Sequence, residues 1–146
     1  MPDFLQMTLD KFTFRVALDR WYTSEGVWAQ MEGNRFRIGL SDFLQQRSGD
    51  VAFVEVKPVG TTAVLGEEIA TLETIKVNIS LASPVSGKVI QVNPLLQTAP
   101  ECINQEPYGA GWLALIEADP WESDRAHLLE PQAYFQKMKA EAEEEK

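Results

Sequence analysis

The feature that most constrains this chain is a succession of short β-rich runs between residues 50 and 92. The runs are 51–56, 69–73, 77–82 and 88–92. The residues that punctuate them are Pro58, Gly60, Gly66, Pro84 and Gly87. Short strands separated by glycine and proline predict an all-β barrel or sandwich.

A short helix is predicted immediately before these runs, from Ser41 to Gly49. Ser41 can cap the first N–H groups, and Asp42 suits the positive end of the helix dipole. Gly49 is placed to end the helix in a left-handed conformation. Phe43 and Leu44 are expected to face the core.

Regular structure is also expected on both sides of this region. Phe12 to Leu18 predicts an early strand or extended arm, and Arg35 to Leu40 alternates as a half-buried strand does. Trp112 to Glu117 predicts a final strand, after a loop-rich stretch. The remainder is expected to be helical from Asp119, and Pro131 suits the first residue of a new helix. Its stripe of Tyr134, Phe135 and Met138 is expected to pack against the barrel.

The length of 146 residues fits one compact domain with a terminal appendage. We expect an N-terminal arm over 1–20, the β domain over 21–118 and a helical C-terminal extension over 119–146. Hydrophobic residues make up 45% of the chain, which is enough for a packed core.

Charge and cysteine content limit the function classes. A formal charge of −9 argues against nucleic acid or an anionic membrane as partner, since both require basic surface. The one cysteine, Cys102, allows no intramolecular disulfide. No apolar run approaches the ~20 residues that cross a bilayer, and the first residues do not resemble a signal peptide. We therefore expect a cytoplasmic protein and a monomer.

One lysine stands between two of the β runs. Lys76 follows the run 69–73 and directly precedes the run 77–82, and the gap suits only a tight hairpin turn. Its ammonium is therefore expected to be solvated at or beside a hairpin tip. A carrier protein needs such a lysine, because a tethered group reaches a high effective concentration at each partner's active site. Most exposed turn lysines serve only as solvated charge, so the spacing alone leaves both interpretations open.

Three longer blocks resemble glycine cleavage H proteins, in the same order and spacing from about Tyr22 to Ile116. The blocks are Gly49-Asp50-Val51-Ala52-Phe53-Val54-Glu55, the stretch from Gly66 to Asn93 that contains Leu72-Glu73-Thr74-Ile75-Lys76 and Ser83-Pro84-Val85-Ser86-Gly87, and Asn104-Gln105-Glu106-Pro107-Tyr108-Gly109-Ala110-Gly111-Trp112-Leu113. Biotinyl carriers usually place methionines beside their lysine, whereas Ile75 and Val77 flank Lys76.

The resemblance implies a mostly β fold, a flattened barrel-sandwich hybrid with short helices and a helical C-terminus. It implies that Lys76 carries lipoate through an amide bond and that Glu73 is recognised by the lipoylating enzyme. The other implied partners are glycine decarboxylase, an aminomethyltransferase and dihydrolipoamide dehydrogenase, between which a non-catalytic carrier would shuttle an aminomethyl group. No catalytic residue and no metal site are expected, and the chain has no Ser/His/Asp triad or zinc-ligand spacing.

The sequence also departs from the family pattern. H proteins usually show a histidine–glutamate pair before their first conserved tryptophan, where this chain has Glu25-Gly26-Val27-Trp28. Two alternatives therefore stay open. One is an H-like lipoate-binding protein that carries sulfur intermediates for a heterodisulfide-reductase-like complex in sulfur oxidation. The other is a barrel-sandwich binding or structural protein that is never modified.

Three further sites have a plainer interpretation. His127 is the only histidine and is expected to be an ordinary surface or packing residue. Cys102 is expected to be buried as a small apolar side chain. Glu67 and Glu68, together with Glu73, are expected to form an acidic rim near the tip, where they would be solvated charge or a recognition surface.

Overall fold

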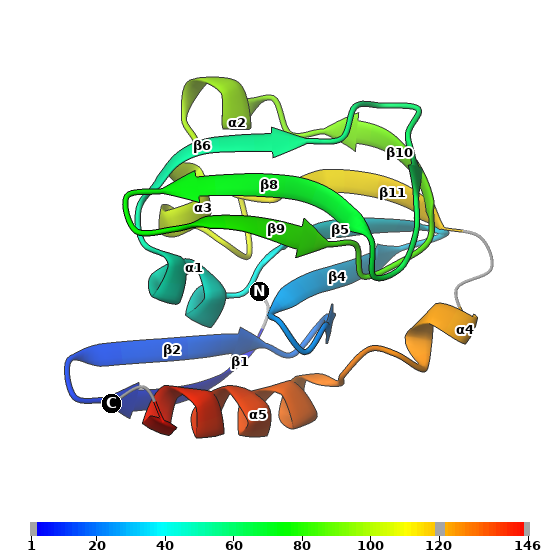
Figure 1. Ribbon diagram of the computed structural model, residues 1–146. Helices are drawn as coiled ribbons and strands as arrows, with labels where there is room; N and C mark the ends of the chain where they lie inside the picture. Colours follow the sequence, from blue (N-terminus) through cyan, green and yellow to red (C-terminus); the bar gives the residue numbers. More distant parts are fainter. Residues whose placement is uncertain (1–2, 119–121, 145–146) are drawn as a thin grey trace.

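Two antiparallel sheets form the body of the protein in the computed structural model, which describes residues 3–118 and 122–144 (Figure 1). The larger sheet has the order β3-β4-β5-β11-β10-β7. Its strands are β3 (Trp21–Tyr22), β4 (Val27–Glu32), β5 (Arg35–Leu40), β7 (Thr62–Ala63), β10 (Gly87–Val92) and β11 (Ala114–Ala118). The smaller sheet has the order β6-β8-β9, with β6 (Val51–Val56), β8 (Glu68–Thr74) and β9 (Asn78–Ala82).

The two sheets face each other across one hydrophobic core, and neither is closed. Inward residues of both contribute, among them Phe36, Ile38, Leu72, Leu81 and Ile116. Burial alternates from Arg35 to Ile38 in β5 and from Ala70 to Glu73 in β8, as the two-residue period of a strand requires. This architecture is the barrel-sandwich fold that the resemblance implies.

A third layer lies below this body (Figure 1). The strands β1 (Phe4–Leu9) and β2 (Phe12–Ala17) pair only with each other, and the 14-residue helix α5 (Pro131–Glu144) packs against them and β3. Phe14, Tyr134 and Met138 are buried in the second core cluster, which lies between this layer and the larger sheet. The apolar stripe of the C-terminal helix therefore packs against the hairpin as well as the barrel.

Helix α1 has the capping residues predicted from the sequence, with one difference at its C-terminal end. Helix α1 (Asp42–Ser48) begins after Ser41, whose Oγ accepts a hydrogen bond from the backbone N–H of Leu44. Phe43 and Leu44 are buried, as predicted. Gly49 has the expected positive φ of 93°, but its ψ of −173° is extended rather than left-handed helical. The other short helices are α2 (Leu95–Thr98), α3 (Cys102–Gln105) and α4 (Glu122–Arg125).

The ends of the chain differ most from expectation. The N-terminal arm contains β1 as well as the predicted strand, and Asp10 at φ 56° helps to form the turn between them. Pro131 begins α5, as predicted. The boundary expected after residue 118 borders residues 119–121, which lie outside the described residues, so the domain limits stay a prediction. Within the described part, no helix is long and apolar enough to cross a membrane.

Candidate functional site

The turn between β8 and β9 presents Lys76 to solvent. The backbone N–H of Thr74 donates to the carbonyl of Val77 at 2.9 Å and closes the turn. The Thr74 hydroxyl oxygen accepts from the N–H groups of Lys76, at 3.1 Å, and Val77, at 3.0 Å. Three hydrogen bonds of Thr74 therefore hold the turn, one of them to the backbone of Lys76, while the Lys76 side chain stays exposed.

Thr74 also ties this turn to the end of α1. Its hydroxyl donates to the backbone carbonyl of Ser48 at 2.7 Å. The partners of this one side chain thus come from two segments that are 26 residues apart. A rigid base follows, from which only the lysine side chain is free to swing.

The stem of Lys76 lies over Gly49. A Cβ placed on Gly49 would stand 3.3 Å from both Cδ and Cε of Lys76, which is tighter than most Cβ contacts. The Lys76 ammonium has no hydrogen bond or ion pair with the residues that the structure describes. An amine with this exposure is open to acylation by a modifying enzyme.

Asn104 fixes the segment that follows α1. Its side-chain oxygen accepts from the N–H of Val51 at 2.9 Å, and its amide donates to the carbonyl of Gly49 at 2.9 Å and to Gln45 at 3.0 Å. This one amide joins α1, β6 and α3. It holds the backbone on which the Lys76 stem rests.

The surface around the tip exposes apolar side chains with one carboxylate, that of Glu73, beside them. Phe53 on β6 is 69% exposed, Ile75 is 79% exposed and Val77 is 44% exposed. Glu73 is exposed and lies opposite Phe53 on one side and Asn78 on the other. Exposed apolar side chains beside a carboxylate suit transient contact with partner proteins.

Glu67 and Glu68 do not join this surface, so the predicted acidic rim is wrong for these two residues. They lie at the beginning of β8, whereas Lys76 follows its end. A seven-residue strand spans about 20 Å between its ends. Glu68 instead accepts a hydrogen bond from the Ser80 hydroxyl at 2.8 Å and lies 3.6 Å from the Lys57 ammonium.

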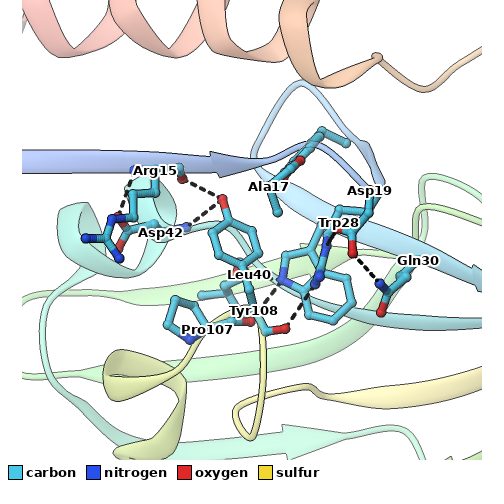
Figure 2. Close-up of polar contacts among 11 residues, drawn as sticks. Arg15, Ala17, Asp19, Trp28, Gln30, Leu40, Asp42, Pro107 and Tyr108 are labelled. Atoms are coloured by element: carbon cyan, nitrogen blue, oxygen red, sulfur yellow. Dashed lines mark hydrogen bonds and ion pairs between the residues drawn. The ribbon is translucent and has the colours of Figure 1, made fainter. Parts of the chain in front are cut away.

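A cluster around Trp28 joins the larger sheet to the β1–β2 hairpin and α1 (Figure 2). The Trp28 indole N–H donates to the carbonyls of Leu40 and Pro107, at 2.9 and 3.0 Å. The Arg20 guanidinium lies 4.5 Å from the Trp28 ring and 5.1 Å from the Tyr108 ring. Burial raises the pKa of Tyr108 to about 12, so its hydroxyl stays protonated and can donate.

Cys102 and His127 have the environments that the sequence predicts. Cys102 is buried, and this burial raises the pKa of its thiol. His127 is exposed. Among residues 3–118 and 122–144, no group of three or more His, Cys, Asp or Glu side chains is arranged to hold a metal ion.

Sequence reasoning singled out Lys76 and Glu73 but missed Thr74, which holds the turn, and Asn104, which holds the segment beneath the Lys76 stem. In the sequence, both stand only within the blocks that resemble H proteins. Thr74 has a local signal, since a threonine at the start of a turn often bonds to the backbone ahead of it. Asn104 has none, because its partners are more than 50 residues away along the chain.

Comparisons with known proteins agree with this geometry. Residues 20–141 match the family model described as glycine cleavage H-protein. A glycine cleavage system H protein of Rubrobacter xylanophilus is 39% identical over 84% of this chain and 94% of its own length. One from Anaeromyxobacter sp. (strain K) is 43% identical over 80% of this chain and 90% of its own.

A solved structure extends the likeness to three dimensions. The crystal structure of a glycine cleavage system H protein from Mycobacterium marinum superposes with a TM-score of 0.74 at 30% identity. It covers 82% of this chain and 95% of that one. Sequence and fold therefore point to the same group of proteins.

Proposed function

Because this chain belongs to the glycine cleavage H-protein family, we propose that it is a lipoyl carrier protein whose lipoate is attached to the Nζ of Lys76. The observation that supports this most is the placement of Lys76. It lies exposed in a turn whose backbone is fixed by Thr74, and its ammonium has no polar partner among the described residues.

The attachment is chemically simple. The lysine amine forms an amide bond with the lipoate carboxyl group, and an activated form of the acid supplies the leaving group. The product has no charge at this position, so the arm loses its preference for bulk water. The chain then contributes a fixed pivot and a flexible tether, which keeps the carried group at high local concentration.

Glu73 is proposed to be recognised by the lipoylating enzyme. It is exposed, precedes the turn and stands beside the apolar side chains of Phe53 and Ile75. An enzyme that approaches the tip therefore meets one carboxylate within an apolar surface. A charge in that position favours correct orientation more than it adds affinity.

In glycine cleavage, Lys76 would hold the lipoate, which would supply an S–S bond that opens as one sulfur takes up the aminomethyl group left by decarboxylation of glycine and the other becomes a thiol. The carrier would then present its arm to the aminomethyltransferase and to dihydrolipoamide dehydrogenase. The residues around Lys76 would supply docking contacts and no general acid or base. The formal charge of −9 suits partners with basic docking surfaces.

Reconstitution tests this role directly. Lipoylated chain is added to glycine decarboxylase and aminomethyltransferase freed of their own H protein, and carbon dioxide release from glycine is measured. The proposal predicts release that depends on the lipoylated chain and is absent with Lys76→Arg. A chain that is lipoylated yet supports no glycine turnover would favour the alternative role in sulfur oxidation. That role would be tested by adding the lipoylated chain to a heterodisulfide-reductase-like complex and measuring oxidation of a sulfur substrate in place of carbon dioxide release.

A further inference from the structure

The two outer edges of the β1–β2 hairpin differ in their hydrogen bonding. The edge of β2 is bonded to side chains of other segments, because β2 lies between β1 and α1 (Figure 1). The backbone N–H of Arg15 donates to the Asp42 carboxylate at 3.0 Å, and the Arg15 carbonyl accepts from the Tyr108 hydroxyl at 2.7 Å (Figure 2). The carbonyls of Thr13 and Ala17 also accept side-chain hydrogen bonds, at 2.9 and 2.7 Å.

The outer edge of β1 has no such partners. In an antiparallel pair, residues that do not bond to each other point their N–H and C=O groups to opposite outer edges. The bonded residues of β2 lie opposite Thr8, Gln6 and Phe4, so these three point their backbone groups away from β2. Beyond the hairpin, their backbone groups make no hydrogen bond with the described part of the chain, and all three residues are exposed.

Strand β1 also lacks the features that usually protect an exposed strand edge. Natural edge strands carry a charge, a proline or a β-bulge, or are covered by another element. The strand Phe-Leu-Gln-Met-Thr-Leu has no charged residue and no proline, and its pairing with β2 runs without a register shift. Helix α5 packs against the hairpin face that carries Leu5, Met7 and Leu9. An unprotected edge of this kind is a template for pairing with another strand.

The strand is complementary to itself in one antiparallel register. Two copies of β1 can bond only where the outward groups of one face those of the other, so Phe4, Gln6 and Thr8 must pair among themselves. The register centred on Gln6 uses all three, with Gln6 opposite Gln6 and Phe4 opposite Thr8. Every outward N–H and C=O of these residues then has a partner. Leu5 lies opposite Met7, which extends the apolar row on the inner face.

The same register brings opposite charges together at its ends. Asp3, which directly precedes β1, would stand opposite Leu9 of the second copy, beside the turn that carries Lys11. Asp3 and Lys11 are exposed, and neither has an ion pair with the described residues. Because β1 itself is uncharged, the paired strands avoid the repulsion that a formal charge of −9 on each copy would otherwise cause.

We propose that the outer edge of β1 binds β1 of a second copy of this chain, so that the two hairpins form one sheet in the order β2-β1-β1-β2. The contact uses the same surface on both copies and therefore closes at a dimer. This dimer differs from the monomer expected from the sequence. It depends on a segment that precedes residue 20, where the family match begins.

Pairing through β1 keeps the two candidate carrier lysines apart. Lys76 lies near the turn of the hairpin, since Leu9, Asp10 and Lys76 line the same groove. The antiparallel arrangement points the two turns in opposite directions, so the two Lys76 side chains lie at opposite ends of the paired strands. Each lysine can then be modified, and can meet a partner enzyme, away from the other copy.

Sedimentation equilibrium tests the dimer. A single strand pairing is a small interface, so the mass of the wild type should rise from 16.4 kDa towards twice that value as the concentration is raised to about 1 mM. Gln6→Pro removes an outward N–H that the hairpin does not use, and this variant should stay at 16.4 kDa. Gln6→Thr keeps that N–H and is the matched control, which should associate as the wild type does. Circular dichroism checks that both variants are folded.

Cysteine crosslinking tests the register in a separate experiment. Gln6→Cys places two thiols beside the two-fold axis, with Cα atoms about 5.5 Å apart, which suits a disulfide. Thr8→Cys lies on the same face of the same strand, but its two copies would be about 14 Å apart, which is too far. After oxidation with diamide, peptide mapping should find a bridge between the introduced cysteines of Gln6→Cys and none in Thr8→Cys. Cys102 is buried and should stay unbridged.

Three results would overturn the proposal. One is a wild type that stays at 16.4 kDa up to about 1 mM. The second is a folded Gln6→Pro that associates as readily as the wild type, which would place the contact elsewhere. The third is an equal yield of bridged dimer from Gln6→Cys and Thr8→Cys. None of these results bears on lipoate attachment at Lys76, so the carrier function would stand or fall separately.

Discussion

The stem of Lys76 lies against Gly49, on the side where a side chain of residue 49 would begin. A Cβ on Gly49 would lie 3.3 Å from Cδ and Cε of Lys76, and the residue has a φ of +93°. The end of α1 and the β8–β9 turn therefore meet at the stem of the lysine. Gly49 combines a backbone conformation that side chains rarely adopt with the space in which this stem lies.

Gly49→Ala should therefore destabilise the protein by about 1 kcal/mol or more, because alanine is strained at this φ. Chemical denaturation measures the change in the free energy of unfolding. Gly60→Ala is the matched control, since Gly60 has a φ of +97° and nothing within 4 Å of its missing Cβ. The two variants should lose similar stability, because the Lys76 stem can shift. An unchanged free energy for Gly49→Ala would contradict the backbone argument.

Thr74→Val should loosen the turn. It removes a hydroxyl that donates to the Ser48 carbonyl and accepts from two backbone N–H groups. Partly buried groups that lose their partners cost about 1–3 kcal/mol. Thr74→Ser keeps the hydroxyl and should stay within about 0.5 kcal/mol of wild type. Hydrogen exchange of the Val77 amide would show the same order, and equal exchange in both variants would argue against the role of this hydroxyl.

Lys76→Arg should leave stability almost unchanged. The side chain is exposed and its ammonium has no polar partner within the described residues, and such substitutions shift stability by at most about 0.5 kcal/mol. Thermal denaturation of the unlipoylated chains checks this. A large drop in melting temperature for the variant would show that Lys76 is structural.

The three tyrosines should resist ionisation until the protein unfolds. Burial raises the pKa of Tyr22, Tyr108 and Tyr134, that of Tyr108 to about 12. The folded state therefore binds more protons than the unfolded state above the ordinary tyrosine pKa of about 10, and stability falls as the pH rises beyond that value. Absorbance at about 295 nm should report tyrosinate only together with unfolding; a gradual titration centred near pH 10 in folded protein would contradict this.

The sequence predicted the parts of this structure that depend on local pattern. The strands β6, β8 and β9, the cap of α1 at Ser41 and the turn position of Lys76 all follow from periodicity and from glycine and proline punctuation. The positions of Glu67 and Glu68 were predicted wrongly. They are close to Lys76 in the sequence, but β8 lies between them and holds them about 20 Å from the turn.

Other parts depend on contacts between distant segments and could not be predicted. The packing of the β1–β2 hairpin on α5 joins the two ends of the chain, and no local pattern predicts it. The bond from Thr74 to Ser48 and the three bonds of Asn104 are of the same kind. The groove of about 330 Å³ beside Lys76 exists only because the β1–β2 hairpin, α1 and α5 meet there.

The most direct test of lipoate attachment at Lys76 is the mass of the chain after expression in cells supplied with lipoate. We expect that the wild type gains the mass of one lipoyl group, that peptide mapping places it on Lys76, and that Lys76→Arg gains none. A lipoyl group on another lysine would contradict it. So would an unmodified wild type in cells that lipoylate a bacterial relative of the family.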